Sequence, residues 1–329
     1  MKRIIFAVFL LFFTFSVLFL SVFAVQTKKS GIATYLLAGF DDAASNTDFL
    51  ALAILNRETK SIAFLQIPRD TFLLNEGESL KINQLYPRAL QGKSKQEKQN
   101  AMHALMCQIS QFLGVSIDGY AAITMNDLPA TIDAIGGVDV YLPFPLTLGQ
   151  GSDAVTLDTG SHHLNGDMAL RFVRNRKGYA MGDLGRTDVQ KLFLCGLVQK
   201  LSAPLTGEAY TALLTRLYKS VTTDKSLPSA LAEVAYWGSA AKTENVYFAT
   251  LAGSSYKGEN GQWYYVLNRR GNEQLLSRFC PLKSEFDPKK LFCDPKDNKM
   301  AQIYSANDIS ARIYTAKELK NLNVILKES

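Results

Sequence analysis

The stretch Phe64-Leu65-Gln66-Ile67-Pro68-Arg69-Asp70-Thr71 sets an arginine and an aspartate directly after a run of apolar residues. The run has the length of a buried strand, and the proline marks its end because proline cannot donate to a sheet ladder. Ligands of open α/β sheets gather where strands end. The stretch therefore predicts a sheet that carries a polar site at one edge.

Two further apolar runs of strand length precede this stretch, and polar turns separate all three. Downstream, segments with helical spacing of apolar residues alternate with short strands, which predicts a layered α/β domain around a central sheet. The predicted strands are 34–40, 49–56, 61–67, 119–125, 138–142, 246–249 and 263–267. The predicted helices are 93–113, 127–134, 165–173, 187–201, 210–220 and 229–241.

The composition is that of an ordinary globular protein. The chain has 329 residues, of which 47% are hydrophobic and 20% charged, and this length suits one large domain or two modest ones. A net charge of +6 is compatible with a nucleic acid, an anionic membrane surface or an anionic substrate. Because the basic residues are scattered among acids and no DNA-reading motif is present, nucleic-acid binding is the weakest of these.

The amino terminus places Met1-Lys2-Arg3 before an uncharged apolar run from Ile4 to Val25. As a helix, this run would span about 33 Å, which is enough for the core of a bilayer. We expect an uncleaved anchor; the alternative is a cleaved secretory signal, for which Val22-Phe23-Ala24 offers a cleavage site. The basic residues before the run favour a cytoplasmic amino terminus and an extracellular body, although Lys28 and Lys29 after it weaken the asymmetry.

Three parts are expected along the chain. Residues 1–29 would hold the cytoplasmic tip, the transmembrane anchor and the start of a linker. No linker divides residues 30–275, so we expect them to form one extracellular domain. Residues 276–329 are polar, Lys-rich and short of apolar periodicity, and we expect them to form an appendage.

The four cysteines permit disulfides in an extracellular compartment. Cys280 and Cys293 flank a charged, proline-containing loop and are the better candidate pair. Cys107 and Cys195 lie in apolar helical patterns and are expected to be buried as small hydrophobic residues.

Familiar catalytic motifs are absent: no GxxxxGK[ST], HExxH, GxSxG or CxxC occurs in the chain. Its three histidines, His103, His162 and His163, stand apart from any arrangement of acid and nucleophile. This pattern argues against a His-based enzyme and leaves acids and arginines to carry any chemistry.

Acids and arginines do gather at the ends of the predicted elements. Asp41 follows the first strand, Asp48 opens the second, and Arg69 and Asp70 follow the third. The segment ALRFVRNRKGYAMGDLGRTDVQK, residues 169–191, concentrates further arginines. Any one of these charges is more simply a solvated loop residue, but as a set they stand at the boundaries of apolar runs. Because guanidinium groups bind phosphate oxygens and carboxylates beside phosphate suit Mg²⁺, the residues predict a metal-assisted pyrophosphate site.

Several motifs follow one another in a characteristic order. They are LLAGFDD (36–42), Thr47-Asp48, Ile67-Pro68-Arg69-Asp70-Thr71, Lys81-Ile82-Asn83 with Tyr86, Ile135-Gly136-Gly137-Val138-Asp139-Val140, Gly160, Leu164-Asn165-Gly166, Ala169-Leu170, Arg174-Asn175-Arg176, Asp183-Leu184-Gly185-Arg186 and Gln190. No single motif is specific, but the ordered series resembles the LytR–CpsA–Psr family of bacterial cell-envelope proteins over residues 34–200, and more weakly to about residue 270.

The resemblance implies a layered α-β-α domain with a central mixed sheet, preceded by one transmembrane helix, at the outer face of a Gram-positive-type membrane. It also implies a phosphotransferase that moves a phosphate-linked glycopolymer, such as teichoic acid or capsule, from an undecaprenyl-pyrophosphate carrier to peptidoglycan. Mg²⁺ or Mn²⁺ would be the cofactor. The partners would be the lipid-linked polymer, peptidoglycan and membrane lipid, with no nucleic acid.

The resemblance also implies roles for individual residues. Asp41 and Asp48 would hold the metal, and Asp183 would orient the site. The pyrophosphate would be bound by Arg69, Arg174, Arg176, Arg186 and Gln190. Arg69, Asp70 and Asp183 would be catalytic, and either Asp48 or Asp70 would accept the proton of the acceptor hydroxyl. A lipid carrier also needs an apolar groove. Helices 127–134 and 188–201 have apolar faces that would line one, and ordinary core packing explains these faces equally well.

Two features depart from the family pattern. The segment from Asp41 to Asp48 has no arginine, whereas relatives often carry one there, and Val189 precedes Gln190 where an Arg–Gln pair is common. Two alternatives stay open. One is a lipid-pyrophosphate hydrolase that uses water as the acceptor, whose sequence would look almost the same; the other, which these departures support, is a non-catalytic protein that binds polyprenyl phosphates during wall assembly.

Overall fold

A computed structural model describes residues 31–41, 46–92, 94–176, 179, 182–202 and 208–322. The predicted anchor at 4–25 and most of the segment between Asp41 and Asp48 lie outside these residues. Within the described ranges, no helix combines the length and the apolar character needed to cross a membrane. The described residues from Ala33 onward form one compact unit.

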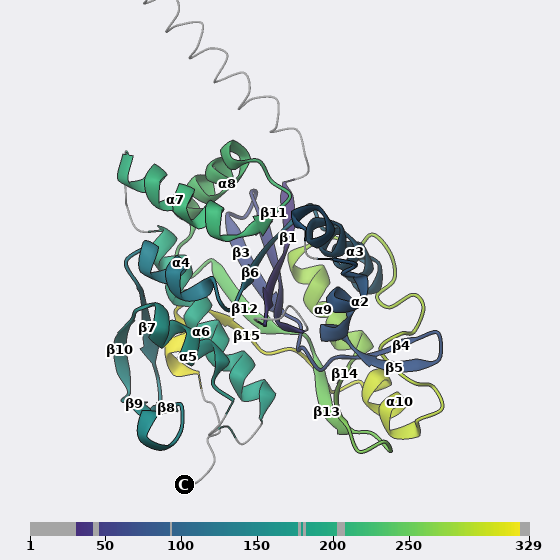
Figure 1. Cartoon of the computed structure of the whole chain (residues 1–329). Coiled ribbons are helices and arrows are strands. Elements are labelled where there is room, and N and C mark those ends of the chain that lie inside the picture. The colour runs from purple at the N-terminus through teal and green to yellow at the C-terminus, as the bar shows by residue number, and fades with distance from the viewer. Residues whose placement is uncertain are drawn as a thin grey trace, which may run out of the picture. The chain divides into compact units, whose positions relative to one another are not determined.

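A seven-stranded sheet lies at the centre of the fold (Figure 1), in the order β11-β6-β1-β2-β3-β12-β15. Its strands are β1 (Ile32–Phe40), β2 (Thr47–Asn56), β3 (Ser61–Gln66), β6 (Gly119–Thr124), β11 (Thr222–Thr223), β12 (Val246–Thr250) and β15 (Ile313–Thr315). β1 runs parallel to β6 and β3 parallel to β12, whereas β2 and β3 form an antiparallel pair. The sheet is therefore mixed, as predicted.

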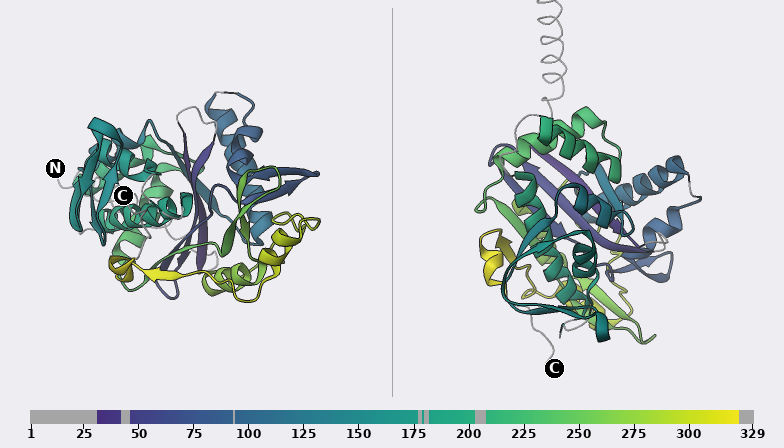
Figure 2. Two further views of the ribbon diagram at one scale, coloured as in Figure 1. Left: turned by 90° about the horizontal axis from the view of Figure 1, so that it is seen from below. Right: turned by 60° about the vertical axis from the view of Figure 1, so that its left-hand side comes forward.

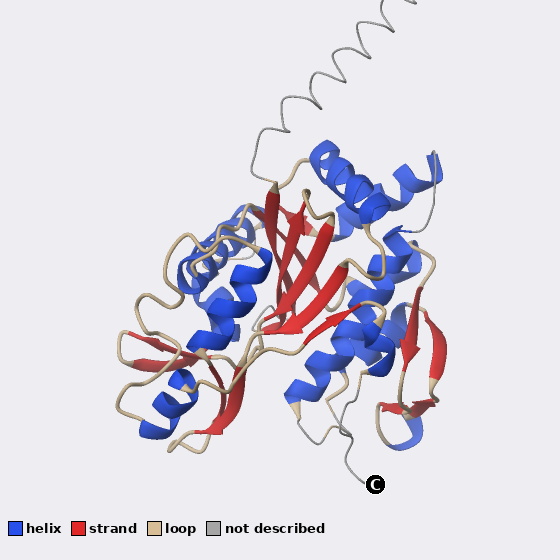
Figure 3. Ribbon diagram, turned by 180° about the vertical axis from the view of Figure 1, so that it is seen from behind, coloured by secondary structure: helices blue, strands red, loops and turns tan. Residues whose placement is uncertain are grey.

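Helices cover both faces of this sheet, and Figure 3 shows the same layers from behind. One face carries α2 (Leu85–Ala89), α3 (Lys95–Leu113) and α9 (Arg269–Phe279). The other carries α4 (Leu128–Ala134), α5 (Gly166–Arg174), α6 (Asp183–Ser202), α7 (Glu208–Ser220) and α8 (Leu227–Ala240). This layering confirms the predicted α/β class.

Local sequence explains where individual helices begin and end. Ser94 accepts a hydrogen bond from the backbone N–H of Glu97, whose carboxylate accepts one from Ser94 in return, so a capping box starts α3. The helix ends at Gly114, whose φ of 66° is left-handed and favours glycine. Asn165 caps α5 by accepting from the N–H of Met168.

Four two-stranded ribbons extend from the central layers. They are β4 (Phe72–Asn75) with β5 (Glu78–Lys81), β7 (Val138–Leu142) with β10 (Gly160–Leu164), β8 (Leu146–Leu148) with β9 (Val155–Leu157), and β13 (Gly253–Lys257) with β14 (Trp263–Leu267). Short helices η1 (Ile82–Gln84), η2 (Gly151–Asp153), η3 (Glu318–Asn321) and α10 (Asn298–Ser305) complete the described elements. Two predicted strands, 138–142 and 263–267, thus lie in ribbons outside the central sheet.

The segment after residue 276, expected to be an appendage, packs into this body. β15 pairs with the central strand β12, and Ala249 faces Ile313 across that pair. Phe286 and Phe292 are fully buried and stack on one another with ring centroids 5.6 Å apart. The buried residues are too few and too irregularly spaced to produce a helical or strand period, which is why the pattern did not reveal them.

The predicted Cys280–Cys293 disulfide is wrong: both thiols are free and buried. Cys280 ends α9, where its Sγ donates to the carbonyl of Leu276, whereas Cys293 packs in a separate apolar cluster with Phe72 and Met300. Burial raises the pKa of each thiol to about 11.

The two other cysteines divide between core and surface. Cys195 is buried, as expected, but Cys107 is exposed. The buried face of α3 runs through Met102, Leu105 and Ile109, and Cys107 lies off that stripe.

Candidate active site

Five charged side chains meet near the start of β2, the end of β3 and the start of α6. Figure 2 gives two further views of the strands and helices of the fold. Asp48 opens β2, Arg69 follows β3, and Arg176 follows α5. Asp183 and Arg186 belong to the first turn of α6. The cluster therefore joins residues that lie far apart in the sequence.

Asp48 lies at the centre of the cluster. Its Oδ1 atom is 2.7 Å from Nη1 of Arg69, 3.0 Å from Nη2 of Arg176 and 3.7 Å from Nη1 of Arg186. The Asp48 side chain is only 7% exposed, so these contacts act in a poorly hydrated environment. Its second oxygen, Oδ2, makes no hydrogen bond or ion pair with any described residue.

Asp183 is the second carboxylate of the cluster. Its Oδ1 atom lies 3.2 Å from Nε of Arg69 and 2.9 Å from Nη2 of Arg186. Arg69 and Arg186 thus each contact both carboxylates. With Arg176, three guanidinium groups face two carboxylates, and one positive charge is left in excess.

Two guanidinium N–H groups within the cluster are buried and make no well-aligned hydrogen bond with a described residue. Nε of Arg186 has no partner among these residues, whereas Nε of Arg69 keeps only its ion-pair contact with Oδ1 of Asp183 at 3.2 Å. A buried donor left unpaired costs about 1–3 kcal/mol. Together with the excess charge, these donors suit an anion that brings several oxygens.

Burial and charge act in opposite directions on the two arginines. Burial on its own lowers the pKa of Arg69, but the carboxylates of Asp183, Asp70 and Asp48 outweigh it and raise the pKa. For Arg186, which is 2% exposed, burial prevails and lowers the pKa despite the carboxylate of Asp183. An arginine titrates so far above neutrality that both remain cations.

Asp70 faces a different cation. Its Oδ1 atom lies 3.0 Å from Nζ of Lys81, while its Oδ2 atom is 3.9 Å from Nε of Arg69. Lys81 in turn lies over the ring of Tyr264, 5.7 Å from its centroid. Lys81 was not predicted as a site residue, although the motif Lys81-Ile82-Asn83 contained the signal.

Three predicted site residues lie at or beyond the margin of this cluster. Asp41 accepts a hydrogen bond from Nδ2 of Asn46 across the β1–β2 turn, at the same end of the sheet as Asp48. Arg174 ends α5 and is exposed. Gln190 is buried, and its amide donates to the carbonyl of Val173, so it joins α6 to α5.

The carboxylates fit a metal that takes some of its ligands from a phosphate. The described residues contain no group of three or more His, Cys, Asp and Glu side chains suited to a metal. Mg²⁺, however, is commonly bound by one or two carboxylates plus substrate phosphates and waters. Asp41 and Oδ2 of Asp48 provide such carboxylate oxygens at one end of the sheet.

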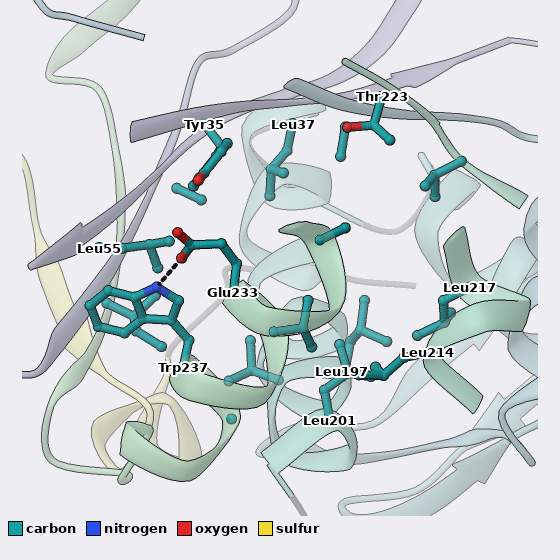
Figure 4. A pocket seen from close by; sticks show the side chains of 18 of the residues that line it. Tyr35, Leu37, Leu55, Leu197, Leu201, Leu214, Leu217, Thr223, Glu233 and Trp237 are labelled. Atoms are coloured by element: carbon teal, nitrogen blue, oxygen red, sulfur yellow. Dashed lines mark hydrogen bonds between the residues drawn. The ribbon is translucent and has the colours of Figure 1, made fainter. Parts of the chain in front are cut away.

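A cavity of about 390 Å³ lies between the sheet and the helices α6, α7 and α8 (Figure 4). Its lining is almost entirely apolar and includes Leu37, Leu55, Leu197, Leu201, Leu214 and Leu217. At one side the carboxylate of Glu233 accepts from the indole of Trp237 and pairs with Arg57. Of the two helices predicted to line a groove, α6 does so, whereas α4 is absent from the lining and α7 and α8 take its place.

The cavity and the charged cluster share two elements. β3 carries Phe64 in the cavity wall and ends just before Arg69. α6 carries Arg186 in the cluster and Leu194 in the cavity wall, about 12 Å apart along the helix. One ligand with an anionic head and an apolar tail could therefore contact both.

The model of the LytR_cpsA_psr family matches residues 18–279. The chain belongs to this family. The resemblance read from the ordered motifs is thereby confirmed.

Other members of the LytR_cpsA_psr family show which proteins the chain is similar to. It is 28% identical over 259 residues to the polyisoprenyl-teichoic acid–peptidoglycan teichoic acid transferase TagU of Bacillus cereus (strain AH820), covering 77% of this chain and 80% of TagU. It is 27% identical over 255 residues to the transferase of the same description, TagV, of Bacillus subtilis (strain 168), covering 73% of this chain and 62% of TagV. The crystal structure of B. subtilis TagV superposes with a TM-score of 0.64 at 25% identity, over 79% of this chain and 98% of that one.

The match to the LytR_cpsA_psr family ends before the fold does. α10, η3 and β15 follow residue 279, and α10 packs against the β13–β14 ribbon. This part of the body is therefore additional to the matched region.

Proposed function

We propose that the chain transfers a phosphate-linked glycopolymer from an undecaprenyl-pyrophosphate carrier to peptidoglycan. One observation carries the proposal: β3, which ends just before Arg69, and α6, which carries Arg186, also line the apolar cavity. A pyrophosphate bound by the cluster would have its prenyl chain directed along α6 into the cavity. The names of TagU and TagV support this choice of carrier, cargo and acceptor.

In this proposal the arginines position the pyrophosphate and stabilise the charge that develops on it. Phosphoryl transfer depends mainly on positioning and charge stabilisation, so it needs no histidine or serine nucleophile. Arg186 would turn its unpartnered Nε–H group to a phosphate oxygen, and Arg69 would bind the phosphate through its guanidinium group beside Asp183. Arg176, at 49% exposure, would approach from the solvent side.

The reaction exchanges one bond to phosphorus for another. The acceptor hydroxyl oxygen attacks the phosphorus that carries the glycopolymer, and the bond from this phosphorus to the bridging oxygen breaks. The carrier leaves as its phosphate monoester, and the glycopolymer becomes joined to peptidoglycan by a phosphodiester. Asp48 or Asp70 would accept the hydroxyl proton.

Asp41 and Asp48 would hold Mg²⁺, or Mn²⁺, against the pyrophosphate oxygens. A bound divalent ion would neutralise part of the charge on those oxygens. The body would lie outside the membrane, anchored by the apolar run at 4–25.

The test is a reconstituted reaction. Full-length protein in lipid nanodiscs would be incubated with a synthetic polyprenyl-pyrophosphate oligosaccharide, Mg²⁺ and uncrosslinked glycan strands, with products identified by mass spectrometry. Arg69→Ala would be compared with Arg171→Ala, because Arg171 pairs with Asp167 on the surface of α5.

We expect a phosphodiester-linked adduct from the wild type and from Arg171→Ala, and none from Arg69→Ala. Free phosphorylated oligosaccharide without adduct would instead support a hydrolase. Tight Mg²⁺-dependent carrier binding without any turnover would support a non-catalytic binding protein.

A further inference from the structure

The β13–β14 ribbon is attached beside the arginine cluster. The backbone N–H of Tyr265 in β14 donates to the carbonyl of Asp70 at 2.8 Å, and Thr71 forms a bridge with Tyr265. Asp70 is the residue next to Arg69. The ribbon therefore starts at the edge of the cluster and extends away from it.

One face of this ribbon is packed. Tyr264 and Val266 join Phe72 and Met300 in an apolar cluster, and Tyr256 donates from its hydroxyl to Asp297, the residue that caps α10. These contacts fix the position of the ribbon. Two of the partners, Asp297 and Met300, lie beyond the part of the chain that the family model matches.

The opposite face is open at its outer end. Side chains alternate along a strand, so Trp263 shares a face with Tyr265, and their cross-strand partners Lys257 and Ser255 share it too. Trp263, Lys257 and Ser255 are all exposed. Trp263 is 58% exposed, against 38% for Tyr141, the next most exposed large hydrophobic side chain of the described chain.

Tyr265 is the buried residue of this face. Its hydroxyl donates to the carbonyl of Leu251. Burial raises the pKa of Tyr265, and the nearby carboxylate of Asp188 in α6 adds to the effect. Trp263 lies two residues farther out, about 7 Å along the strand. Trp263 thus lies two residues beyond the hydrogen bond by which Tyr265 attaches the ribbon to Asp70, the neighbour of Arg69.

We propose that Trp263, with Lys257 beside it, forms the platform on which the acceptor glycan strand rests during transfer. An indole presents a broad apolar surface with a polar edge, which suits the C–H face of a pyranose ring. The ammonium group of Lys257 can donate to sugar hydroxyl and carboxylate oxygens. This inference rests on the proposed function, because it assigns the second substrate of the same site.

The chain contains only two tryptophans, and they lie in the two regions that the proposals distinguish. Trp237 is 5% exposed and lines the apolar cavity, whereas Trp263 is exposed on the ribbon. Trp237→Phe leaves Trp263 as the only indole, and Trp263→Phe leaves Trp237. Fluorescence of the two full-length variants in nanodiscs therefore reports on acceptor and carrier separately.

The titrants are uncrosslinked glycan strands and polyprenyl pyrophosphate. Glycan should shift the emission of Trp263 to shorter wavelength and saturate, and the lipid should change the emission of Trp237. The wild type fixes the glycan concentration that is sufficient for transfer. If the emission of Trp263 stays constant at that concentration, Trp263 does not bind the glycan and the proposal is wrong. If the lipid leaves the emission of Trp237 unchanged while glycan shifts the emission of Trp263, the proposed carrier site is wrong and the proposed glycan platform is supported.

Kinetics supply a second test. Trp263→Ala should raise the KM for glycan about tenfold and leave carrier binding unchanged. Trp263→Tyr should restore most of the loss, because it keeps an aromatic surface. Tyr141→Ala on β7 is the matched control, since it removes an exposed aromatic side chain from another ribbon. An unchanged KM in Trp263→Ala contradicts the proposal.

Discussion

The Nη1 atom of Arg69 lies 2.7 Å from Oδ1 of Asp48, and the register of an antiparallel pair accounts for this contact. β2 and β3 pair Ala51 with Gln66, and the N–H of Ile67 still donates to the carbonyl of Leu50 beyond the end of β3. Continued by two residues, the same register sets Asp48 opposite Arg69. The strand pair thus brings the first acid and the first arginine of the site together.

Arg69→Ala should reduce glycopolymer transfer by about 10²–10³-fold, the loss expected when one donor to a developing anion is removed. Arg69→Lys should restore little, because an ammonium group cannot form the bidentate fork. Initial rates of adduct formation are the measurement. Equal activity of Arg69→Ala and Arg171→Ala, with both variants folded, would remove Arg69 from the mechanism.

Arg186→Met should destabilise the fold by about 3–5 kcal/mol, because it leaves the carboxylate of Asp183 without its closest buried cation. Arg186 is among the largest fully buried side chains of the described residues. Denaturant unfolding would measure the change, with Arg269→Met, an exposed ion-pair partner of Glu273, as the control. If Arg186→Met lowers the free energy of unfolding no more than Arg269→Met does, the Arg186–Asp183 ion pair does not stabilise the fold.

Removing divalent metal with a chelator should abolish transfer, and Mg²⁺ should restore it. Asp41→Asn should raise the Mg²⁺ concentration needed for half-maximal rate, because an amide is a weaker ligand than a carboxylate. Asp158→Asn, in an exposed loop, should behave as the wild type. Full transfer activity in the presence of chelator would show that the reaction does not require a divalent metal.

Leu197→Trp should fill part of the apolar cavity and weaken binding of the carrier about tenfold or more. Because the site is roomy, stability should change by less than about 1.5 kcal/mol. Binding of polyprenyl pyrophosphate would be measured beside Val155→Trp, which places the same side chain at an exposed position of β9. Unaltered affinity in Leu197→Trp would place the prenyl chain elsewhere.

Cys280 and Cys293 should resist alkylation at pH 8, because burial raises the pKa of both thiols to about 11 and leaves little thiolate. Exposed Cys107 should react at once. In the unfolded chain the two thiols lose their protons near pH 9, so stability should fall as pH rises from about 9 to about 11. Peptide mapping without reductant that recovers a Cys280–Cys293 link would contradict the structure.

Apolar patterns predicted β1, β2, β3, β6 and β12 of the central sheet and most helices, because these elements bury a continuous stripe or run. They missed the short strands β11 and β15 at the two edges of the sheet. They placed the start of α6 at residue 187, whereas the helix begins at Asp183, because Asp183, Arg186 and the glycines of this turn carry no apolar signal. Asp183 and Arg186 were therefore predicted from the family motif and not from the helix pattern.

Other parts of the site depend on contacts between residues far apart in the chain, and these contacts cannot be predicted from the local pattern of a single sequence. Tyr264 meets Lys81 only because β14 binds back to Asp70 across nearly two hundred residues of chain. Likewise, the cavity is built from β1, β2, β3 and β6 on one side and from α6, α7 and α8, which begin at or beyond residue 183, on the other. Composition and apolar periodicity predict each helix or strand by itself, but they do not predict which other elements it packs against.

In the proposed function, one carrier molecule occupies the arginine cluster and the apolar cavity together. A structure of the full-length protein with a non-cleavable polyprenyl-pyrophosphate analogue tests it most directly. We expect pyrophosphate oxygens within hydrogen-bond distance of Arg69 and Arg186, and prenyl carbons against Leu197 and Trp237. A pyrophosphate bound away from both arginines, or a prenyl chain outside the cavity, would contradict it.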